Sequence, residues 1–329
     1  MVTPVKMTVE EKTFPLAAPF SITGHTFTNL QTVWVSLDAN GATGRGEGTG
    51  SYYLGETQST ISAELESVRD QVEAGITREE LAALLPVGGA RNALDCALWD
   101  LECKTTGSTI WQVLDLVPRQ LTTVATLGVA SPEEMAAQGA RWHEFPALKV
   151  KLDNNLVIER IAAIREARPE ATLVIDVNQG WTFEDLKAYT PKLDSLGVSF
   201  IEQPLPRGKD EELVGFDSPI PLGADESCLG LEDYAVISGR YDMINIKLDK
   251  CGGLTEGLAL AERAAKDGLG VMVGNMTGTS LSMAPSYVLG QYCSLVDIDG
   301  PLLLEQDCAD GLEYQPGGLV SIPTAELWG

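Results

Sequence analysis

The chain has 329 residues, of which 44% are hydrophobic and 21% charged, as in ordinary soluble globular proteins. Its formal net charge of −24 opposes binding to nucleic acid or to an anionic membrane. No window approaches about 18 uninterrupted apolar residues, so the sequence predicts no membrane-spanning helix.

The amino-terminal segment, MVTPVKMTVEEKTF, lacks the apolar centre of a signal peptide, so we expect a cytoplasmic protein. The six cysteines are scattered without CxxC spacing, which is typical of free, packed thiols in a reducing compartment. The first part of the chain has a mixed character, because residues 2–14 and 32–37 alternate like β-strands whereas residues 56–84 have helical spacing.

A glycine-rich segment, NGATGRGEGTGSYYLGE, follows the second predicted strand. It does not fit G-x-G-x-x-G, because Thr49 stands where the third glycine would be, and Glu47 would repel a phosphate. We therefore predict a mobile loop here and not a nucleotide site. The next clear element is ARNALDCALWDLECKTTG, residues 90–107, which predicts an amphipathic helix with Gly107 just past its end.

Eight short apolar runs alternate with helical stretches after about residue 118. From the second run onward, each has a marker residue, usually polar, at its carboxyl end, and successive markers are 22 to 27 residues apart. A strand, a turn and a short helix fit that length, so the pattern predicts an α/β fold with a closed (β/α)8 barrel. An open doubly wound sheet would also fit the alternation. The runs are TTVATLG, ALKVKLD, ATLVIDVNQ, GVSFIEQP, IPLGADES, DMINIKLD, GLGVMVGN and YCSLVDID.

These patterns divide the chain into three parts. Residues 1–117 form a mixed α+β domain, residues 118–304 form the barrel, and residues 305–329 depart from the barrel rhythm. The last part contains GGLVSIPTAELWG, which could form a strand and a tail that returns to the first domain.

Three acids end consecutive predicted barrel strands: Asp176, Glu202 and Asp225. Catalytic groups of such barrels lie where strands end and loops begin. Three uncompensated carboxylates there would be costly to bury, and a divalent cation would remove that cost. Oxygen ligands without histidine or cysteine favour Mg²⁺ over Zn²⁺. Alternatively, each acid caps the following helix or pairs with a lysine.

Lysines end two other predicted strands. Lys149 and Lys151 share one face of the second strand in LKVKLD, and Lys247 ends the sixth. In an eight-strand ring these two strands are opposed, with the three acids between them. This arrangement suits proton transfer at a carbon beside a carboxylate, because one amine removes the α-proton and the other returns a proton to the opposite face. The result is an inverted stereocentre.

A lysine base must be uncharged before it can accept a proton. We expect the neighbouring ammonium group and the metal ion to disfavour the charged form and to lower the pKa of Lys149 or Lys151. The alternative is a surface strand whose two lysines extend into solvent.

These motifs resemble the enolase superfamily, and within it the muconate-lactonising subgroup. KVK, DVNQG, IEQP, GADES and IKLDKCGG each match a signature, and RNALDCALWDLECK and GRGEGTGSYYLGET look like the helix and loop ahead of the barrel. The resemblance implies an amino-terminal α+β capping domain, completed by the carboxyl-terminal tail, and a homo-oligomer. It implies one Mg²⁺ per subunit bound by Asp176, Glu202 and Asp225. It also implies Lys151 and Lys247 as acid/base catalysts, with Lys149 assisting.

Asp297 and Asp299 in VDIDGPLLL look like the Asp-x-Asp motif by which dipeptide epimerases hold the α-ammonium group of the substrate. The resemblance thus implies an epimerase that inverts the α-carbon of the carboxyl-terminal residue of L-Ala-D/L-Glu or a related dipeptide. An N-acylamino acid racemase, a muconate-type cycloisomerase and a non-catalytic barrel that binds a small molecule or metal remain as alternatives, and the two acids could simply form a solvated turn.

Two positions depart from the Ala-Glu pattern and leave the preferred side chain open. Gly24 stands where an arginine is common, and Gly128 stands where a serine is frequent. His25 either contacts an acidic substrate group or is an ordinary exposed loop residue. Further residues expected to line the pocket are Thr126, Asn275, Met276 and Thr277.

Overall fold

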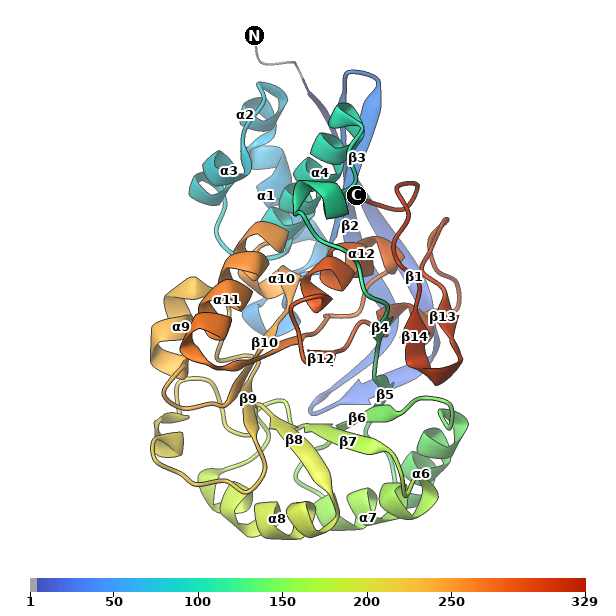
Figure 1. Ribbon diagram of the computed structural model, residues 1–329, viewed down its shortest axis with the longest axis vertical. Helices are drawn as coiled ribbons and strands as arrows, with labels where there is room; N and C mark the ends of the chain where they lie inside the picture. Colours follow the sequence, from blue (N-terminus) through green and yellow to red (C-terminus); the bar gives the residue numbers. More distant parts are fainter. Residues whose placement is uncertain (1–4) are drawn as a thin grey trace.

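The computed structural model describes residues 5–329 and has two main parts, a capping region and a barrel (Figure 1). The capping region begins with an antiparallel sheet of β1 (Lys6–Ile22), β2 (His25–Ala39) and β3 (Ala42–Gly48). Both predicted strands are present and longer than expected, although residues 2–4 lie outside the described part. Val33, Val35 and Leu37 alternate along β2 and are fully buried.

The glycine-rich segment is not the mobile loop that we predicted. Residues 42–48 form β3, and its alternate residues Gly44, Gly46 and Gly48 face α4 (Gly89–Thr106). A Cβ on Gly46 would lie 2.1 Å from the Ala93 carbonyl oxygen, and one on Gly44 would lie 2.3 Å from the Ala97 carbonyl oxygen. The glycines therefore let a strand and a helix approach backbone to backbone.

Four helices complete the capping region. The predicted helix at 90–107 is α4, which ends at Gly107 in the left-handed conformation, with a φ of 70°. Residues 56–84 form three separate helices, and Thr57 and Thr77 close capping boxes at the first and third of them. These three are α1 (Gln58–Ser67), α2 (Arg69–Glu73) and α3 (Arg78–Leu84).

All eight predicted barrel strands are present in one curled parallel sheet, in the order β12-β11-β10-β9-β8-β7-β6-β5. The two edges of this sheet meet, because the Val124 amide beside β5 donates to the Val296 carbonyl of β12 at 3.0 Å. The strands are β5 (Ala125–Leu127), β6 (Ala147–Lys151), β7 (Thr172–Asp176), β8 (Val198–Glu202), β9 (Leu222–Ala224), β10 (Met243–Ile246), β11 (Gly270–Val273) and β12 (Leu295–Val296).

An α-helix does not follow every strand, contrary to the repeating unit that we predicted. In the described residues, only the short 3-10 helix Glu211–Leu213 connects β8 to β9, and β12 is followed by the 3-10 helices Gly300–Leu303 and Pro316–Gly318 and not by an α-helix. Four prolines between positions 204 and 221 explain the first case, because proline interrupts helical hydrogen bonding. The helices that do cover the barrel are α6 (Pro132–Arg141), α7 (Val157–Ala167), α8 (Phe183–Ser195), α9 (Leu231–Ile237), α10 (Leu248–Cys251), α11 (Leu254–Asp267) and α12 (Ser280–Gly290).

The end of the chain returns to earlier elements. A small sheet joins β4 (Leu121–Thr122), β13 (Tyr314–Gln315) and β14 (Leu319–Val320). The Gly329 carbonyl accepts a hydrogen bond from Ile110 in α5 (Ile110–Val113) at 2.7 Å, and the Gly329 amide donates to Asp100 of α4 at 2.8 Å. The domain boundaries at residues 117 and 304 stay a prediction.

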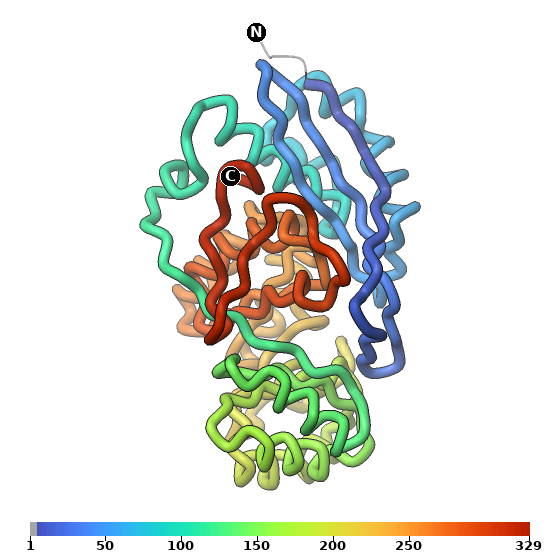
Figure 2. The backbone as a smooth tube through the Cα atoms, turned by 90° about the vertical axis from the view of Figure 1, so that its right-hand side faces the viewer, coloured from blue at the N-terminus to red at the C-terminus, as the bar shows by residue number. Residues whose placement is uncertain are grey.

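The β1–β2 hairpin reaches from the capping region to the barrel, as Figure 2 shows for the blue segment beside the green one. At its tip, Thr23 donates hydrogen bonds to the carbonyls of Leu152 and Val177, just after β6 and β7, at 2.9 and 3.2 Å. The hairpin tip therefore lies at the carboxyl ends of the barrel strands.

All six cysteines are free, and five of them are buried. Within residues 5–329, none of the helices combines the length and apolar character needed to cross a membrane.

Candidate active site

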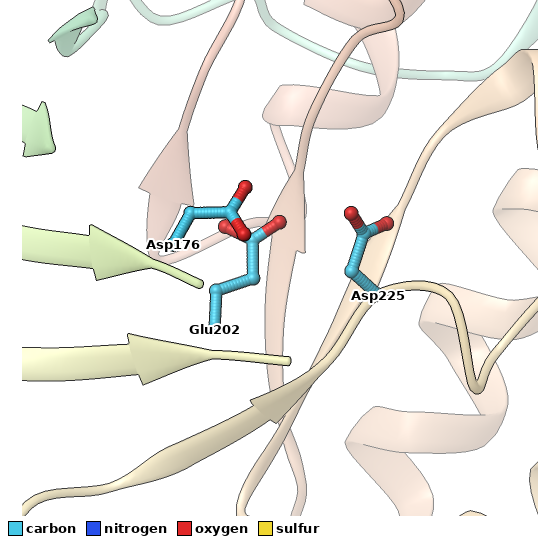
Figure 3. A group of neighbouring side chains, drawn as sticks. All are labelled: Asp176, Glu202 and Asp225. Carbon is cyan, nitrogen blue, oxygen red and sulfur yellow. The ribbon is translucent and has the colours of Figure 1, made fainter. Parts of the chain in front are cut away.

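Three carboxylates meet at the carboxyl ends of neighbouring strands (Figure 3). Asp176 ends β7, Glu202 ends β8, and Asp225 directly follows β9. Each is fully buried, and each offers an oxygen within 4.8 Å of the others. The parallel register explains the convergence, because Asp176 pairs directly with Glu202 across β7 and β8.

The lysines of β6 point into the barrel and reach these acids. Lys149 Nζ lies 2.8 Å from both Glu202 Oε2 and Asp297 Oδ2, and Lys151 Nζ lies 2.5 Å from Asp176 Oδ2. Leu148 and Val150 are on the other face of the strand and are fully buried among apolar residues. The strand is therefore buried on both faces, and its lysines do not extend into solvent.

Lys247 follows β10 and lies 2.7 Å from Asp225 Oδ2. Three strands separate β6 from β10 in the sheet, and the acids come from those three strands. Lys149, Lys151 and Lys247 nevertheless line one cavity. Amines from two separated strands thus flank the carboxylates.

The protein's own groups, without the metal ion of our prediction, raise the pKa of Lys149. Burial lowers the pKa of Lys149, but Asp297, Glu202 and Asp176 outweigh burial and raise the pKa well above its usual range. For Lys247, burial again lowers the pKa, but Asp225, Glu202 and Asp176 together outweigh burial and raise the pKa above its usual range. Among the protein's own groups, the surrounding acids therefore affect the pKa values of Lys149 and Lys247 more than the neighbouring ammonium groups do.

The pKa values of Glu202 and Asp225 shift in opposite directions. Burial raises the pKa of Glu202 to about 7, helped by the charge of Asp176. Burial would also raise the pKa of Asp225, but Lys247 and Lys250 hold that pKa well below its ordinary value. Lys250, which the sequence interpretation did not single out, is buried and lies 2.7 Å from Asp225 Oδ1.

The chemistry of the three acids fits a hard divalent cation. The donors are all carboxylate oxygens, buried and close together, which is the ligand type that Mg²⁺ prefers. Glu202 Oε2 is buried without a hydrogen bond of acceptable geometry, although Lys149 Nζ lies 2.8 Å away. A buried oxygen that lacks a hydrogen bond is available as a ligand atom.

Asp297 and Asp299 are buried and already have protein partners. Asp297 pairs with Lys149 and accepts a hydrogen bond from Asn275 Nδ2 at 3.1 Å. Asp299 accepts one from the Thr126 amide at 2.7 Å, and burial together with the charge of Asp297 raises its pKa to about 8. The two acids are therefore not a solvated turn.

The cavity above the carboxylates contains most of the residues singled out from the sequence. His25 does not line it: its ring packs against Phe27 and Tyr52, with centroids 4.2 and 5.4 Å apart. Residues of the sequence-based set that line the cavity are Thr126, Lys149, Lys151, Asp225, Lys247, Asn275, Met276, Thr277, Asp297 and Asp299.

Other cavity residues were missed. Asn178 and Glu226 stand within the DVNQG and GADES motifs, so their sequence neighbours were a usable signal. The capping region also contributes cavity residues. No local pattern predicted them, because they reach the cavity only through the hairpin and the turn after β3. These residues are Phe20, Ile22, Phe27, Tyr52 and Tyr53.

Residues 132–316 match the enolase C-terminal domain-like family, and residues 4–115 match the N-terminal domain of the mandelate racemase/muconate lactonizing enzyme family. The chain belongs to the enolase superfamily. Both the fold and the resemblance inferred from the sequence motifs are thereby confirmed.

Similar proteins include the L-Ala-D/L-Glu epimerase of Escherichia coli K12, which is 41% identical over 94% of this chain and 98% of its own length. A solved structure of an enolase family member from Agrobacterium tumefaciens, with bound sodium and L-Ala-L-Glu, has a TM-score of 0.96 at 42% identity and covers 99% of this chain and 100% of its own. The dipeptide epimerase of Methylococcus capsulatus, solved with Mg and L-Arg-D-Lys, has a TM-score of 0.91 at 29% identity, with 98% and 97% covered.

Proposed function

We propose that this protein is a magnesium-dependent dipeptide epimerase, an isomerase that inverts the α-carbon of the carboxyl-terminal residue. The observation that carries the proposal is one cavity in which amines from β6 and β10 flank three buried carboxylates. The dipeptide epimerases among its relatives support the same reaction class.

Asp176, Glu202 and Asp225 would hold one Mg²⁺ per subunit. When bound, the ion would stabilise the negative charge that grows on the substrate carboxylate as the α-proton leaves. The three acids each come from a different strand end, so the barrel fixes their spacing before any ligand arrives.

Lys151 removes the α-proton from one face in this proposal, and Lys247 delivers a proton to the other face. For the opposite epimer the two roles are exchanged. Lys151 pairs with Asp176 and Lys247 with Asp225, so each lysine must give up its ion pair when those carboxylates act as ligands. Lys149, which pairs with Glu202 and Asp297 in this structure, would assist by donating a hydrogen bond to the substrate carboxylate.

Asp297 and Asp299 would bind the α-ammonium group of the dipeptide. Asn275 orients Asp297, and the Thr126 amide orients Asp299. Met276 lines the same cavity. A substrate ammonium would compete with Lys149 for Asp297, and this exchange would free Lys149 for the carboxylate.

The direct test is α-proton exchange in D₂O with a panel of dipeptides, with and without EDTA. We expect metal-dependent deuterium uptake and inversion for at least one dipeptide. Absence of uptake by every dipeptide would instead favour a barrel that only binds a small molecule or metal. Asp297→Asn distinguishes the remaining enzymes: an unchanged rate would favour an N-acylamino acid racemase or a cycloisomerase, whose substrates lack the ammonium.

Single-lysine variants test the two-base scheme. We expect Lys151→Ala and Lys247→Ala each to lower the rate of inversion by at least about 10²-fold, the low end for general acid–base groups. Each variant should still exchange the α-proton of one epimer only, and the two variants should retain opposite epimers. Retention of the same epimer by both would contradict the opposed arrangement.

The proposal includes a homo-oligomer located in the cytoplasm, with the three-part division at residues 117 and 304. Size-exclusion chromatography with light scattering tests the assembly. A mass equal to one chain of 35.2 kDa would contradict it.

A further inference from the structure

We propose that this metal site selects Mg²⁺ over Ca²⁺, because the protein holds one oxygen of each carboxylate with a fixed hydrogen bond and leaves only the other oxygen for the ion. Asn245 and Lys250, together with the backbone amide of Asn178, are the groups that hold these oxygens. The inference rests on the proposed function, and it names the residues that decide which divalent ion the site accepts.

One oxygen of each acid faces a lysine of the proposed reaction. Lys149 Nζ lies 2.8 Å from Glu202 Oε2 and also 3.4 Å from Asp176 Oδ2, so these two oxygens face the same point. In the proposed reaction the lysines serve the substrate, so the oxygens beside them become available to an ion. The remaining pairs are Lys151 with Asp176 Oδ2, at 2.5 Å, and Lys247 with Asp225 Oδ2, at 2.7 Å.

The other oxygen of each acid accepts a hydrogen bond from a group outside the proposed proton transfer. Asp176 Oδ1 accepts from the Asn178 amide at 2.9 Å. Glu202 Oε1 accepts from Asn245 Nδ2 at 2.7 Å. Asp225 Oδ1 accepts from Lys250 Nζ, also at 2.7 Å. The three acids follow three different strands, yet each has one oxygen beside a lysine of the proposed reaction and one oxygen held by a different donor.

These donors are fixed by their surroundings. Asn245 lies within β10 and is fully buried. Lys250 is also buried, and besides Asp225 Oδ1 its ammonium group donates to the backbone carbonyls of Asp225 and Asn245. These bonds use all three N–H groups of the ammonium. The Asn178 amide belongs to the backbone of the turn after β7. The held oxygens are therefore occupied before any ion binds.

Carboxylates that offer one oxygen each suit Mg²⁺ better than Ca²⁺. Mg²⁺ requires an octahedron of about six ligands and usually keeps several waters, so three single oxygens leave positions for water and for a substrate oxygen. Ca²⁺ takes about six to eight oxygens and often binds both oxygens of one carboxylate. That mode would break the hydrogen bond from Asn245 or Lys250 to a buried carboxylate, and hydrogen bonds to ionised groups are among the strong ones.

The experiment titrates the metal-free protein with Mg²⁺ and, separately, with Ca²⁺ by isothermal calorimetry in the absence of substrate. The readout is the Kd for Ca²⁺ divided by the Kd for Mg²⁺, which does not depend on activity. We expect the Kd for Ca²⁺ to exceed that for Mg²⁺ in the wild type, because the held oxygens deny Ca²⁺ its larger ligand set.

Asn245→Leu tests the hydrogen bond to Glu202. Leucine is similar in bulk to asparagine but has no donor, so Glu202 Oε1 becomes free to bind an ion. In the described part of the chain, Asn245 Oδ1 accepts no hydrogen bond, so its loss leaves no donor unpaired there. We expect the ratio of the two Kd values to fall by about 10-fold or more, the scale at which groups that orient metal ligands act.

Lys250→Met tests the hydrogen bond to Asp225, and Lys149→Met is its matched control. Each variant removes one buried ammonium group close to a ligand carboxylate, at 2.7 and 2.8 Å, but only Lys250 lies on a held oxygen. Mg²⁺ and Ca²⁺ carry the same charge, so the loss of a cation should change both affinities similarly and cancel in the ratio. We expect the ratio to fall by about 10-fold in Lys250→Met and to stay unchanged in Lys149→Met.

A wild type that binds Ca²⁺ more tightly than Mg²⁺ would overturn the inference while leaving the epimerase intact. An unchanged ratio in Asn245→Leu or in Lys250→Met would do the same, as would an equal fall in Lys149→Met and Lys250→Met. Circular dichroism and the Tm show whether each variant folds, and Asn245→Leu decides the question if Lys250→Met does not fold. A wild type that binds neither ion would instead contradict the magnesium site of the proposed function.

Discussion

Gln203 shows how one residue can link two of the proposed metal ligands. It directly follows Glu202, is fully buried and has a φ of 38°, which is unusual for a residue with a side chain. Its Oε1 accepts hydrogen bonds from the amides of Asp225 and Ser227 at 2.8 and 3.0 Å. Its Nε2 donates to Tyr241 Oη at 3.2 Å. Gln203 therefore holds the end of β9 against the end of β8.

Gln203→Met should weaken binding of Mg²⁺ by about 10- to 100-fold, the range typical of groups that orient metal ligands. Methionine keeps the length of the side chain but cannot accept the Asp225 amide. Isothermal titration of the metal-free variant with Mg²⁺ measures the effect independently of activity.

Tyr241→Phe is the control for this experiment. It removes a hydroxyl that bonds to Gln203 and to Asp210 but leaves the acceptor for the Asp225 amide in place. We expect lower stability with unchanged Mg²⁺ affinity. Equal weakening of Mg²⁺ binding in both variants would show that general loosening, and not the Gln203 acceptor, is responsible.

At the scale of elements, the contact between β3 and α4 decides how the capping region is built. Gly44, Gly46 and Gly48 place the strand backbone against the helix backbone, where a side chain would collide. The turn with Tyr52 and Tyr53 directly follows this strand, so the close contact also fixes where the cavity wall begins.

Gly46→Ala should lower the free energy of unfolding by about 1–3 kcal/mol or more, because the new methyl group must push β3 away from α4. Gly239→Ala is a suitable control, since nothing lies within 4 Å of the position that its new methyl group would take and its φ is not in the left-handed region. Urea unfolding of both variants measures the difference. A Gly46→Ala variant as stable as Gly239→Ala would contradict the close contact.

At the scale of the whole molecule, a buried carboxyl joins the two main parts. Glu47 of β3 accepts hydrogen bonds from the amide of Thr279, at 3.1 Å, and from its hydroxyl, at the amino end of α12. Burial raises the pKa of Glu47 from 4.5 to about 7, although the hydrogen bonds from Thr279 lower it. The folded protein therefore binds this proton more tightly than the unfolded chain.

This difference predicts a pH dependence of stability. The contribution of Glu47 is complete below the unfolded pKa of 4.5 and is lost as the pH rises through about 7. Glu47→Gln keeps a hydrogen-bonding side chain but cannot ionise. Relative to the wild type, this variant should gain about 2 kcal/mol in free energy of unfolding between about pH 5.5 and pH 8.5. A constant difference between the two proteins at both pH values would show that Glu47 does not titrate in this window.

The sequence by itself determined the barrel strands, the residues at their ends and the inward face of Lys149 and Lys151. These features follow from local periodicity, because a strand repeats every two residues and parallel strands present their carboxyl ends at one edge. The acids and lysines of the candidate site could be predicted from the sequence for the same reason.

Only the tertiary structure decided how those groups interact and what covers them. The glycine-rich sequence of β3 is typical of a loop, and only the contact with α4 explains why it forms a strand. Tyr53 lines the cavity only because the turn after β3 brings it there. The pKa shift that the protein's own acids cause at Lys149 was also not accessible from the sequence, because it depends on a carboxylate 148 positions away in the chain. Spacing along a chain encodes local geometry, whereas burial and pairing depend on contacts between segments that no local pattern records.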